Sequence, residues 1–204
     1  MIYNVPFSLS KRQLRVGSDL KDVCIGMPSL FFYYKDFHYG GLLDTGADNN
    51  IAPFDFGFSC GFLSREELIR IYKNLLFQDS GGVGGKVKLS PKFSMKVKLM
   101  VTEKIEESLE KTIEVQFIIP QNISEFDKYM TLKNFLEQSE HATDQRLLKR
   151  RNEGLKEYTK IYSRLRSPFL LGKPFMAMFK SIKFTINEET PESTKSNSYF
   201  ELEL

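Results

Sequence analysis

The sequence predicts a mainly β fold with helical additions, and two observations support this prediction. Several short stretches alternate apolar and polar residues at the two-residue period of a strand with one buried face, as at Phe93, Met95, Val97 and Leu99. Residues 122–165 break this pattern, because charged residues become frequent, β-branched residues become rare and apolar residues recur at helical spacing. We therefore expect a β core with a helical insertion before the last strands.

Length and composition favour one domain without cofactors. The chain has 204 residues, enough for one sizeable core, and its net charge of +3 implies no general role in nucleic-acid binding. Two cysteines are too few for a disulfide framework, and His38 and His141 lie too far apart in sequence to suggest a zinc site. The first 30 residues carry several charges and no long apolar run. We therefore expect no signal peptide, no membrane-spanning segment and a cytoplasmic location.

Strands are expected on both sides of a turn that follows Leu43. Aromatic and β-branched residues favour strands, and proline is tolerated at a strand end or edge. The expected elements, in chain order, are strand-like pieces at Ile2–Tyr3 and Gln13–Val16, a strand over Ser29–Tyr34, a hairpin turn at 35–38, a returning strand over 39–43 and an edge strand at Ile51–Ala52 before Pro53.

Residues 54–77 combine a phenylalanine-rich stretch with a helix. Four phenylalanines and two glycines interleave between 54 and 62, which we interpret as a loop with apolar anchors in the core. Ser64-Arg65-Glu66-Glu67 matches a capping box, in which the Ser64 hydroxyl accepts from an early backbone N–H and Glu67 reaches back. The helix is expected over 65–77, with Leu68, Ile71, Tyr72 and Leu75 on its packed face.

A β-hairpin is expected over 78–101, with a glycine-rich tip. Gly81-Gly82-Val83-Gly84-Gly85 admits many backbone conformations, since glycine tolerates positive φ. Thr112–Pro120 alternates apolar and polar residues and predicts a further strand. Residues 181–186 alternate in the same way, and 188–204 form a polar tail in which only Tyr199–Leu202 resembles a strand.

Two helices are expected in the insertion at 122–165. Leu132, Phe135 and Leu136 indicate the first, and Gly154 is a candidate break near the second. A basic run covers 146–166, and we interpret it mainly as the solvated face of a helix. The alternative is a surface that docks an acidic partner or nucleic acid, although no aromatic residues interleave to stack bases. The second helix is indicated by Leu155, Tyr158, Tyr162 and Leu165, and the basic run contains Lys149, Arg150, Arg151, Lys156, Lys160, Arg164 and Arg166.

The turn after Leu43 carries the strongest chemical signal. Two leucines run into Asp44, and Thr45-Gly46-Ala47 follows. This order predicts a buried strand that ends in a tight turn with one carboxylate, where Gly46 permits a sharp bend and Thr45 can hydrogen-bond to the backbone. An ordinary turn aspartate after a strand would show the same short pattern.

Three motifs resemble those of the retropepsins, the retroviral-type aspartic proteases, in the family's order. Leu42 to Asp48 resembles the catalytic motif, and Ser80 to Lys86 resembles the glycine-rich flap tip. Phe169 to Lys173 resembles the aliphatic-aliphatic-glycine motif near the family's C-terminal end. By this order, the resemblance implies a retropepsin-like core of about residues 20–120 and 166–187, with a helix added after the catalytic turn and the insertion at 122–165.

The resemblance implies an aspartic endopeptidase that acts as a homodimer on polypeptide substrates. Such proteolysis needs two carboxylates that share one proton, and one motif per chain means that Asp44 must meet its own copy across a twofold axis. Thr45 would interlock the two turns, and Asp48 would pair with Lys173, where the family usually has arginine. Lysine lacks the planar fork of arginine, so this pair is expected to be looser. The implied substrate-binding residues are Ala47, Asp48, Asn49, Gly82, Val83 and Gly84, and Leu171, Gly172 and Lys173 would support the site.

Other chemistries fit less well. Asp79-Ser80-Gly81-Gly82 resembles the nucleophile motif of chymotrypsin-like serine proteases, but His38 lies only six residues before Asp44 and its usual surroundings are missing. A phosphate loop at 81–86 has the wrong spacing. The main alternative is a catalytically silent retropepsin-like domain used for dimerisation or peptide binding. A second is a basic adaptor that docks partners through 146–166.

Overall fold

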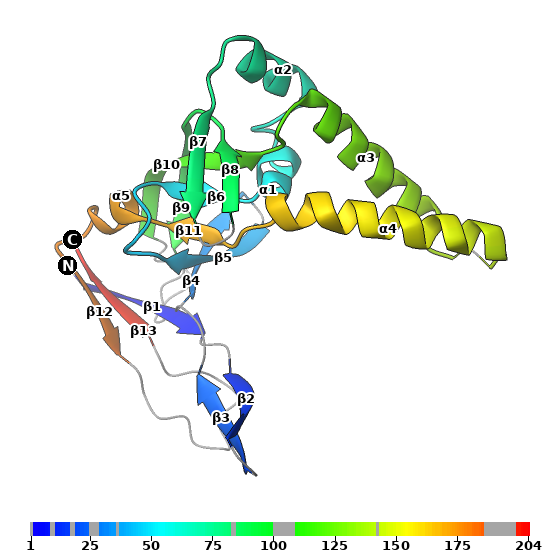
Figure 1. Cartoon of the computed structure of the whole chain (residues 1–204). Coiled ribbons are helices and arrows are strands. Elements are labelled where there is room, and N and C mark those ends of the chain that lie inside the picture. Colours follow the sequence, from blue (N-terminus) through cyan, green and yellow to red (C-terminus); the bar gives the residue numbers. More distant parts are fainter. Residues whose placement is uncertain are drawn as a thin grey trace. The chain divides into compact units, whose positions relative to one another are not determined.

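The computed structural model describes residues 2–8, 11–16, 19–24, 29–35, 37–82, 85–99, 109–141, 143–185 and 199–204. In these residues the chain is mainly β with several helices (Figure 1). It divides into two compact units, each built from separate stretches of sequence. The first unit comprises Met1–Ile51, Ser94–Val115 and Pro168–Leu204, and the second comprises Ala52–Phe93 and Gln116–Ser167.

A closed barrel of six strands forms the core of the first unit. Neighbouring strands pair around a ring in the order β4, β5, β11, β6, β10 and β9, and β9 pairs with β4 to close it. Side chains that alternate along the strands fill the interior, among them Leu30, Phe32, Val97 and Val115. The strands are β4 (Ser29–Tyr34), β5 (Phe37–Leu43), β6 (Asn50–Ala52), β9 (Phe93–Leu99), β10 (Leu109–Ile119) and β11 (Phe169–Leu171).

The two ends of the chain pair with each other. β1 (Ile2–Ser8) lies antiparallel to β13 (Tyr199–Glu203), with Ile2 opposite Glu203 and Val5 opposite Phe200. β13 also pairs with β12 (Ser181–Thr185). Val5 and Phe200 are fully buried, which explains why the strand-like stretch at the end of the polar tail is ordered as a strand. β2 (Lys11–Val16) and β3 (Asp19–Cys24) form a separate hairpin.

The second unit contains a hairpin and helices. β7 (Gln78–Gly82) and β8 (Gly85–Leu89) are antiparallel, and Ile118 of β10 pairs with Leu89. Phe117 packs against phenylalanines that precede and follow the hairpin, and Phe54 packs against Tyr129. The helices are α1 (Phe54–Ser59), α2 (Arg65–Lys73), α3 (Ile123–Gln138) and α4 (Gln145–Leu165).

The stretch predicted as a phenylalanine-rich loop is a helix at its start, but its phenylalanines pack in the core as predicted. Residues 54–59 form the helix α1, which follows Pro53, and the rings of Phe54 and Phe58 contact each other one helical turn apart. Phe54 and Phe56 are buried as expected. The glycine at 57 is required there, because an added Cβ would lie 2.8 Å from the ring of Phe117.

The helix predicted over 65–77 ends earlier, at Lys73. Leu75 adopts φ of 52°, and the amides of Leu75 and Leu76 donate to the carbonyls of Tyr72 and Ile71, as in a Schellman cap. Leu75 is therefore 74% exposed instead of packed. Ser64 caps the helix by accepting from the Glu67 amide, but the Glu67 carboxylate binds Arg70 and does not reach back.

Other boundaries also differ. The returning strand β5 starts at Phe37, two residues before the predicted start, and α4 continues through Gly154 without a break. A Cβ added at Gly154 would lie 3.4 Å from the ring of Phe135, which is an ordinary van der Waals distance, so this position faces α3 without requiring glycine. β9 pairs with β4 and β10 and is not part of the β7–β8 hairpin. The short helix α5 (Lys173–Met176) was not predicted.

Candidate functional site

Two segments far apart in sequence meet at the end of β5. β5 and β11 are parallel neighbours, with Leu43 beside Leu171, and the Asp44 amide continues the pairing by donating to the Leu171 carbonyl at 3.1 Å. Gly41 permits this close approach, because a Cβ at that position would lie 2.7 Å from a methyl carbon of Leu171. β11 also pairs with β6, so it lies between the strands that enter and leave the Asp44 turn.

The turn itself is held by its own backbone. The Gly46 amide donates to Oδ1 of Asp44 at 2.9 Å, and the Ala47 amide donates to the Asp44 carbonyl at 3.1 Å. Asp44 is half-buried, whereas Thr45 and Gly46 are exposed. The carboxylate is thus oriented by a backbone N–H and presented at the surface of the first unit, where a second carboxylate or a substrate could reach it.

Gly172 and Lys173 contact the residues that follow Gly46 in the turn. The Lys173 amide donates to the Ala47 carbonyl at 2.9 Å. Any side chain at Gly172 would meet backbone, because an added Cβ would lie 2.5 Å from the Asn49 carbonyl oxygen and 2.6 Å from that of Ala47. Glycine is the residue that fits this contact.

Asp48 and Lys173 form an ion pair between the same two segments. Nζ of Lys173 lies 2.6 Å from Oδ1 of Asp48, across 125 residues of sequence. The hydrogen bond and the positive charge of Lys173 hold the pKa of the Asp48 carboxyl below its ordinary value. Both side chains are largely exposed, so the pair adds little stability, and its contact fixes the direction of Asp48.

Asn50 is a site residue that the sequence interpretation missed. It is 1% exposed, and its Oδ1 accepts from the Gly172 amide at 2.9 Å while its Nδ2 donates to the Glu114 carbonyl at 2.9 Å. One side chain therefore ties β6 to the end of β11 and to β10. The two-residue period of a strand could have indicated this role. Asn50 and Ala52 share the buried face of β6, and a buried asparagine must be hydrogen-bonded.

The structure brings together the predicted residues of the turn and of the C-terminal motif, namely Asp44, Thr45, Gly46, Ala47, Asp48 and Asn49 with Leu171, Gly172 and Lys173. Gly82 ends β7 in the second unit. Val83 and Gly84, predicted at the flap tip, lie outside the described residues.

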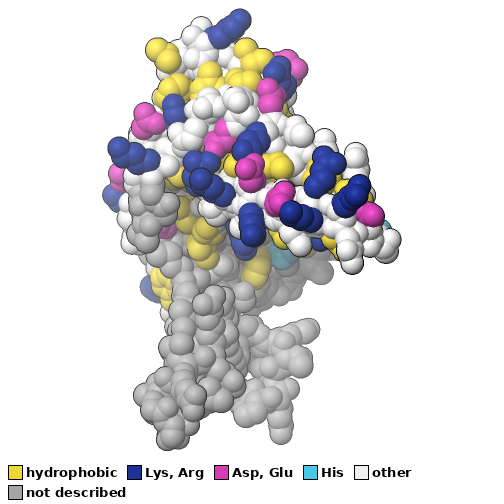
Figure 2. Space-filling view, turned by 45° about the vertical axis from the view of Figure 1, so that its right-hand side comes forward, with side chains coloured by type: hydrophobic (Ala, Val, Ile, Leu, Met, Phe, Trp, Pro, Cys, Tyr) yellow, Lys and Arg dark blue, Asp and Glu magenta, His cyan; other side chains and the backbone are white. Residues whose placement is uncertain are grey.

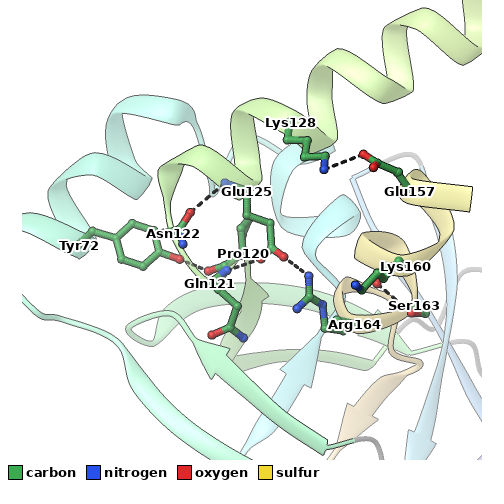
Figure 3. Close-up of polar contacts among 10 residues, drawn as sticks. All are labelled: Tyr72, Pro120, Gln121, Asn122, Glu125, Lys128, Glu157, Lys160, Ser163 and Arg164. Carbon is green, nitrogen blue, oxygen red and sulfur yellow. Dashed lines mark hydrogen bonds and ion pairs between the residues drawn. The ribbon is translucent and has the colours of Figure 1, made fainter. Parts of the chain in front are cut away.

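A second polar cluster lies in the other unit, where α3 begins beside α4 (Figure 3). Asn122 caps α3 by accepting from the Glu125 amide, and Glu125 accepts from the Gln121 amide and pairs with Arg164. Lys128 pairs with Glu157, and Tyr72 donates to the Pro120 carbonyl. A groove of about 310 Å³ runs between the helices. Because the charges pair across it, the cluster acts as a clamp that fixes α4 against α3.

The described residues show no metal site and no membrane span. No three His, Cys, Asp or Glu side chains within them could hold a metal ion, and none of their helices is long and apolar enough to cross a membrane. Comparison of the chain with models of protein families, with curated proteins and with solved structures gives no match.

Proposed function

We propose that this chain is a retropepsin-like aspartic endopeptidase whose active site forms from two copies of the Asp44 turn. One observation carries the proposal. The segments Asp44–Ala47 and Leu171–Lys173 resemble two separate motifs of one family. Two backbone hydrogen bonds join them, from the Asp44 amide to the Leu171 carbonyl at 3.1 Å and from the Lys173 amide to the Ala47 carbonyl at 2.9 Å. Chance matches to short motifs have no reason to meet in this way. The closed barrel that carries the turn is compatible with the proposed family fold.

The proposed mechanism uses one proton shared by the two Asp44 carboxylates. The ionised carboxylate takes a proton from water as the water oxygen attacks the scissile carbonyl carbon. The protonated carboxyl gives its proton to the carbonyl oxygen, which produces a neutral tetrahedral diol. The carboxyl that took the proton from water then gives it to the amide nitrogen, while the other carboxylate removes a proton from a hydroxyl of the diol. The C–N bond breaks, which leaves a carboxylic acid and an amine and restores one shared proton on the two aspartates. Because one carboxyl must be ionised and the other protonated, activity is expected to pass through a maximum below neutral pH.

The neighbouring residues take supporting roles in this proposal. The backbone around Gly46, Ala47 and Asp48 would bind an extended substrate through hydrogen bonds. The Asp48–Lys173 pair would keep the turn in register with α5. The β7–β8 hairpin would close over the substrate and exclude water, as the flap resemblance implies.

The test compares the wild-type chain with Asp44→Asn on a peptide library at several pH values. Asparagine keeps the volume of the side chain and removes its ionisation, so cleavage is expected to disappear while the melting temperature stays close to that of wild type. Cleavage at an unchanged rate by Asp44→Asn would refute the proposal. A wild-type chain that binds peptides or dimerises without cleaving them would favour the catalytically silent domain. Loss of cleavage on Ser80→Ala would favour the serine-protease alternative instead.

A further inference from the structure

Helix α4 concentrates positive charge on one element of the second unit. It contains seven of the 29 Lys and Arg residues of the chain and two of the 26 Asp and Glu residues. Its net charge is therefore +5, and the rest of the chain has a net charge of −2. Figure 2 shows Lys and Arg side chains gathered on the face where the α3–α4 hairpin comes forward. A general excess of basic residues does not explain this pattern.

Several of these cations lack partners within the described part of the chain. Arg164 pairs with Glu125, and Glu157 of α4 pairs with Lys128 of α3. Arg150 lies over the ring of Phe135. By contrast, no described carboxylate lies within 4.0 Å of the charged groups of Arg146, Lys149 or Lys156, which are all exposed. The helix therefore presents charge that its own unit does not neutralise.

Two exposed leucines of α4 are each followed directly by a lysine in the sequence. Leu148 is 36% exposed and Leu155 is 44% exposed, whereas Ile161 and Leu165 of the same helix are buried. Leu148-Lys149 and Leu155-Lys156 form the same pair of residues seven positions apart, which is two helical turns or about 10.5 Å. The two leucines therefore follow one line along the helix, and the two lysines follow a neighbouring line about 100° away around its axis.

We propose that this face of α4, defined by Leu148, Lys149, Leu155 and Lys156, docks an acidic helical segment of a partner protein. The segment would carry apolar side chains at seven-residue spacing, flanked by Asp or Glu. Charge complementarity excludes a second copy of α4, because two helices of net charge +5 repel each other. The exposed leucines favour a protein over a nucleic acid, since phosphate contacts would use the lysines alone.

Ion pairs in the C-terminal half of α4 hold the helix in place before any partner binds. The contacts of Arg164 with Glu125 and of Glu157 with Lys128 fix α4 to α3, and the rings of Tyr129 and Tyr158 stack at 5.2 Å between centroids. A partner would meet a helix that is already formed, so its binding would not require α4 to fold.

The experiment titrates the full chain with a fluorescein-labelled peptide made of three repeats of Leu-Glu-Glu-Ala-Glu-Glu-Ala and measures fluorescence anisotropy. A peptide of the same composition with scrambled order serves as the reference, and an RNA oligonucleotide of similar charge is a third probe. Wild type is expected to bind the patterned peptide about tenfold more tightly than the scrambled one. Added salt is expected to weaken both.

Matched variants separate the contacts. Leu148→Ser with Leu155→Ser should remove the preference for the patterned peptide, and Lys149→Gln with Lys156→Gln should weaken both peptides. Leu75→Ser with Leu76→Ser, and Lys96→Gln with Lys183→Gln, change exposed residues of the same types elsewhere and should leave binding unchanged. Circular dichroism checks that α4 remains folded.

Three outcomes would overturn the proposal. Equal binding of both peptides would show attraction by charge alone. RNA binding that is tighter than peptide binding and insensitive to the leucine variant would identify a nucleic-acid surface. No binding of any of the three probes would show that α4 is a solvated helix. The proposal does not depend on proteolysis, so Asp44→Asn should bind the peptide like wild type.

Discussion

The amide of Asp44 donates to the carbonyl of Leu171, with 3.1 Å between nitrogen and oxygen. This bond extends the parallel pairing of β5 and β11 by one residue beyond Leu43 and Leu171. The direction of the Asp44 turn therefore depends on residues near the other end of the chain. Changes at Gly172, which touch no atom of Asp44, are expected to disturb the carboxylate.

Gly172→Ala is the first prediction. The new Cβ would lie 2.5 and 2.6 Å from the carbonyl oxygens of Asn49 and Ala47, and backbone cannot rotate away as a side chain can. We expect a loss of about 1–3 kcal/mol in the free energy of unfolding and a larger loss of peptidase activity. Urea denaturation and cleavage rates measure the two effects. Gly81→Ala is the stability control, since its Cβ meets nothing within 4 Å.

Asn50→Ala is the second prediction. It removes the side-chain acceptor of the buried Gly172 amide, and it also removes a part-buried hydrogen bond to the Glu114 carbonyl. Because an unsatisfied buried group costs about 1–3 kcal/mol, we expect the free energy of unfolding to fall by about that amount. Asn49→Ala, at a half-buried neighbour, is expected to cost less than about 1 kcal/mol. Equal effects of the two variants would show that Asn50 does not tie the three segments together.

The third prediction concerns the cap of α2. Leu75 has φ of 52°, a conformation that costs a residue with a Cβ about 1 kcal/mol or more, and its side chain is 74% exposed. Leu75→Gly is therefore expected to stabilise the chain by about 0.5–1 kcal/mol, which thermal denaturation can measure. Leu76→Gly, whose backbone gains nothing from glycine, should destabilise it. A loss of stability on Leu75→Gly would mean that the leucine side chain contributes packing that its exposure does not suggest.

The fourth prediction concerns alkaline pH. Burial, followed by hydrogen bonds with Tyr158 and Asp55, raises the pKa of the Tyr129 hydroxyl above its ordinary value. The folded state then keeps a proton that the unfolded state loses, so stability from this group is complete below about pH 10 and falls as the pH rises above it. One such proton contributes a slope of up to about 1.4 kcal/mol per pH unit. Tyr129→Phe should reduce this slope, measured by urea denaturation between about pH 9 and 11.5, and an unchanged slope in this variant would contradict the prediction.

The sequence predicted the elements whose signal is local. Apolar and aromatic residues predicted β4, and alternation predicted β9 and β10. The Ser64 hydroxyl caps α2 as predicted, because these features depend on neighbouring residues alone. The Asp44 turn and the Gly172 motif were identified separately. Their meeting could not be derived from spacing, because it depends on β11 pairing with both β5 and β6.

Failures of prediction occurred where tertiary packing overrides local preference. Phenylalanines with interleaved glycines suggested a loop, yet Phe54, Phe126 and Tyr129 pack together and order residues 54–59 as a helix. Gly154 suggested a break, but α4 continues through it from Gln145 to Leu165, where the helix packs on α3. Asn50 gave only the weak signal of a polar residue at a buried position of a strand, and its partners lie 64 and 122 residues away in sequence.

The last prediction concerns self-association, on which the proposed activity depends. Each chain contributes one Asp44, so monomers would hold half of the site and specific activity should fall on dilution. Adding excess Asp44→Asn to wild type should suppress activity further, because most wild-type subunits would then share a site with a variant that cannot ionise. Adding the same excess of the Asp44→Asn, Gly172→Ala double variant should suppress wild-type activity less. If Gly172 helps to hold the turn at the interface, this variant forms fewer mixed dimers. Sedimentation measured beside activity over a wide range of concentrations provides the comparison. A chain that stays monomeric and fully active throughout would rule out a dyad shared between subunits, and a stable dimer without activity would leave the Asp44 turn as a structural contact.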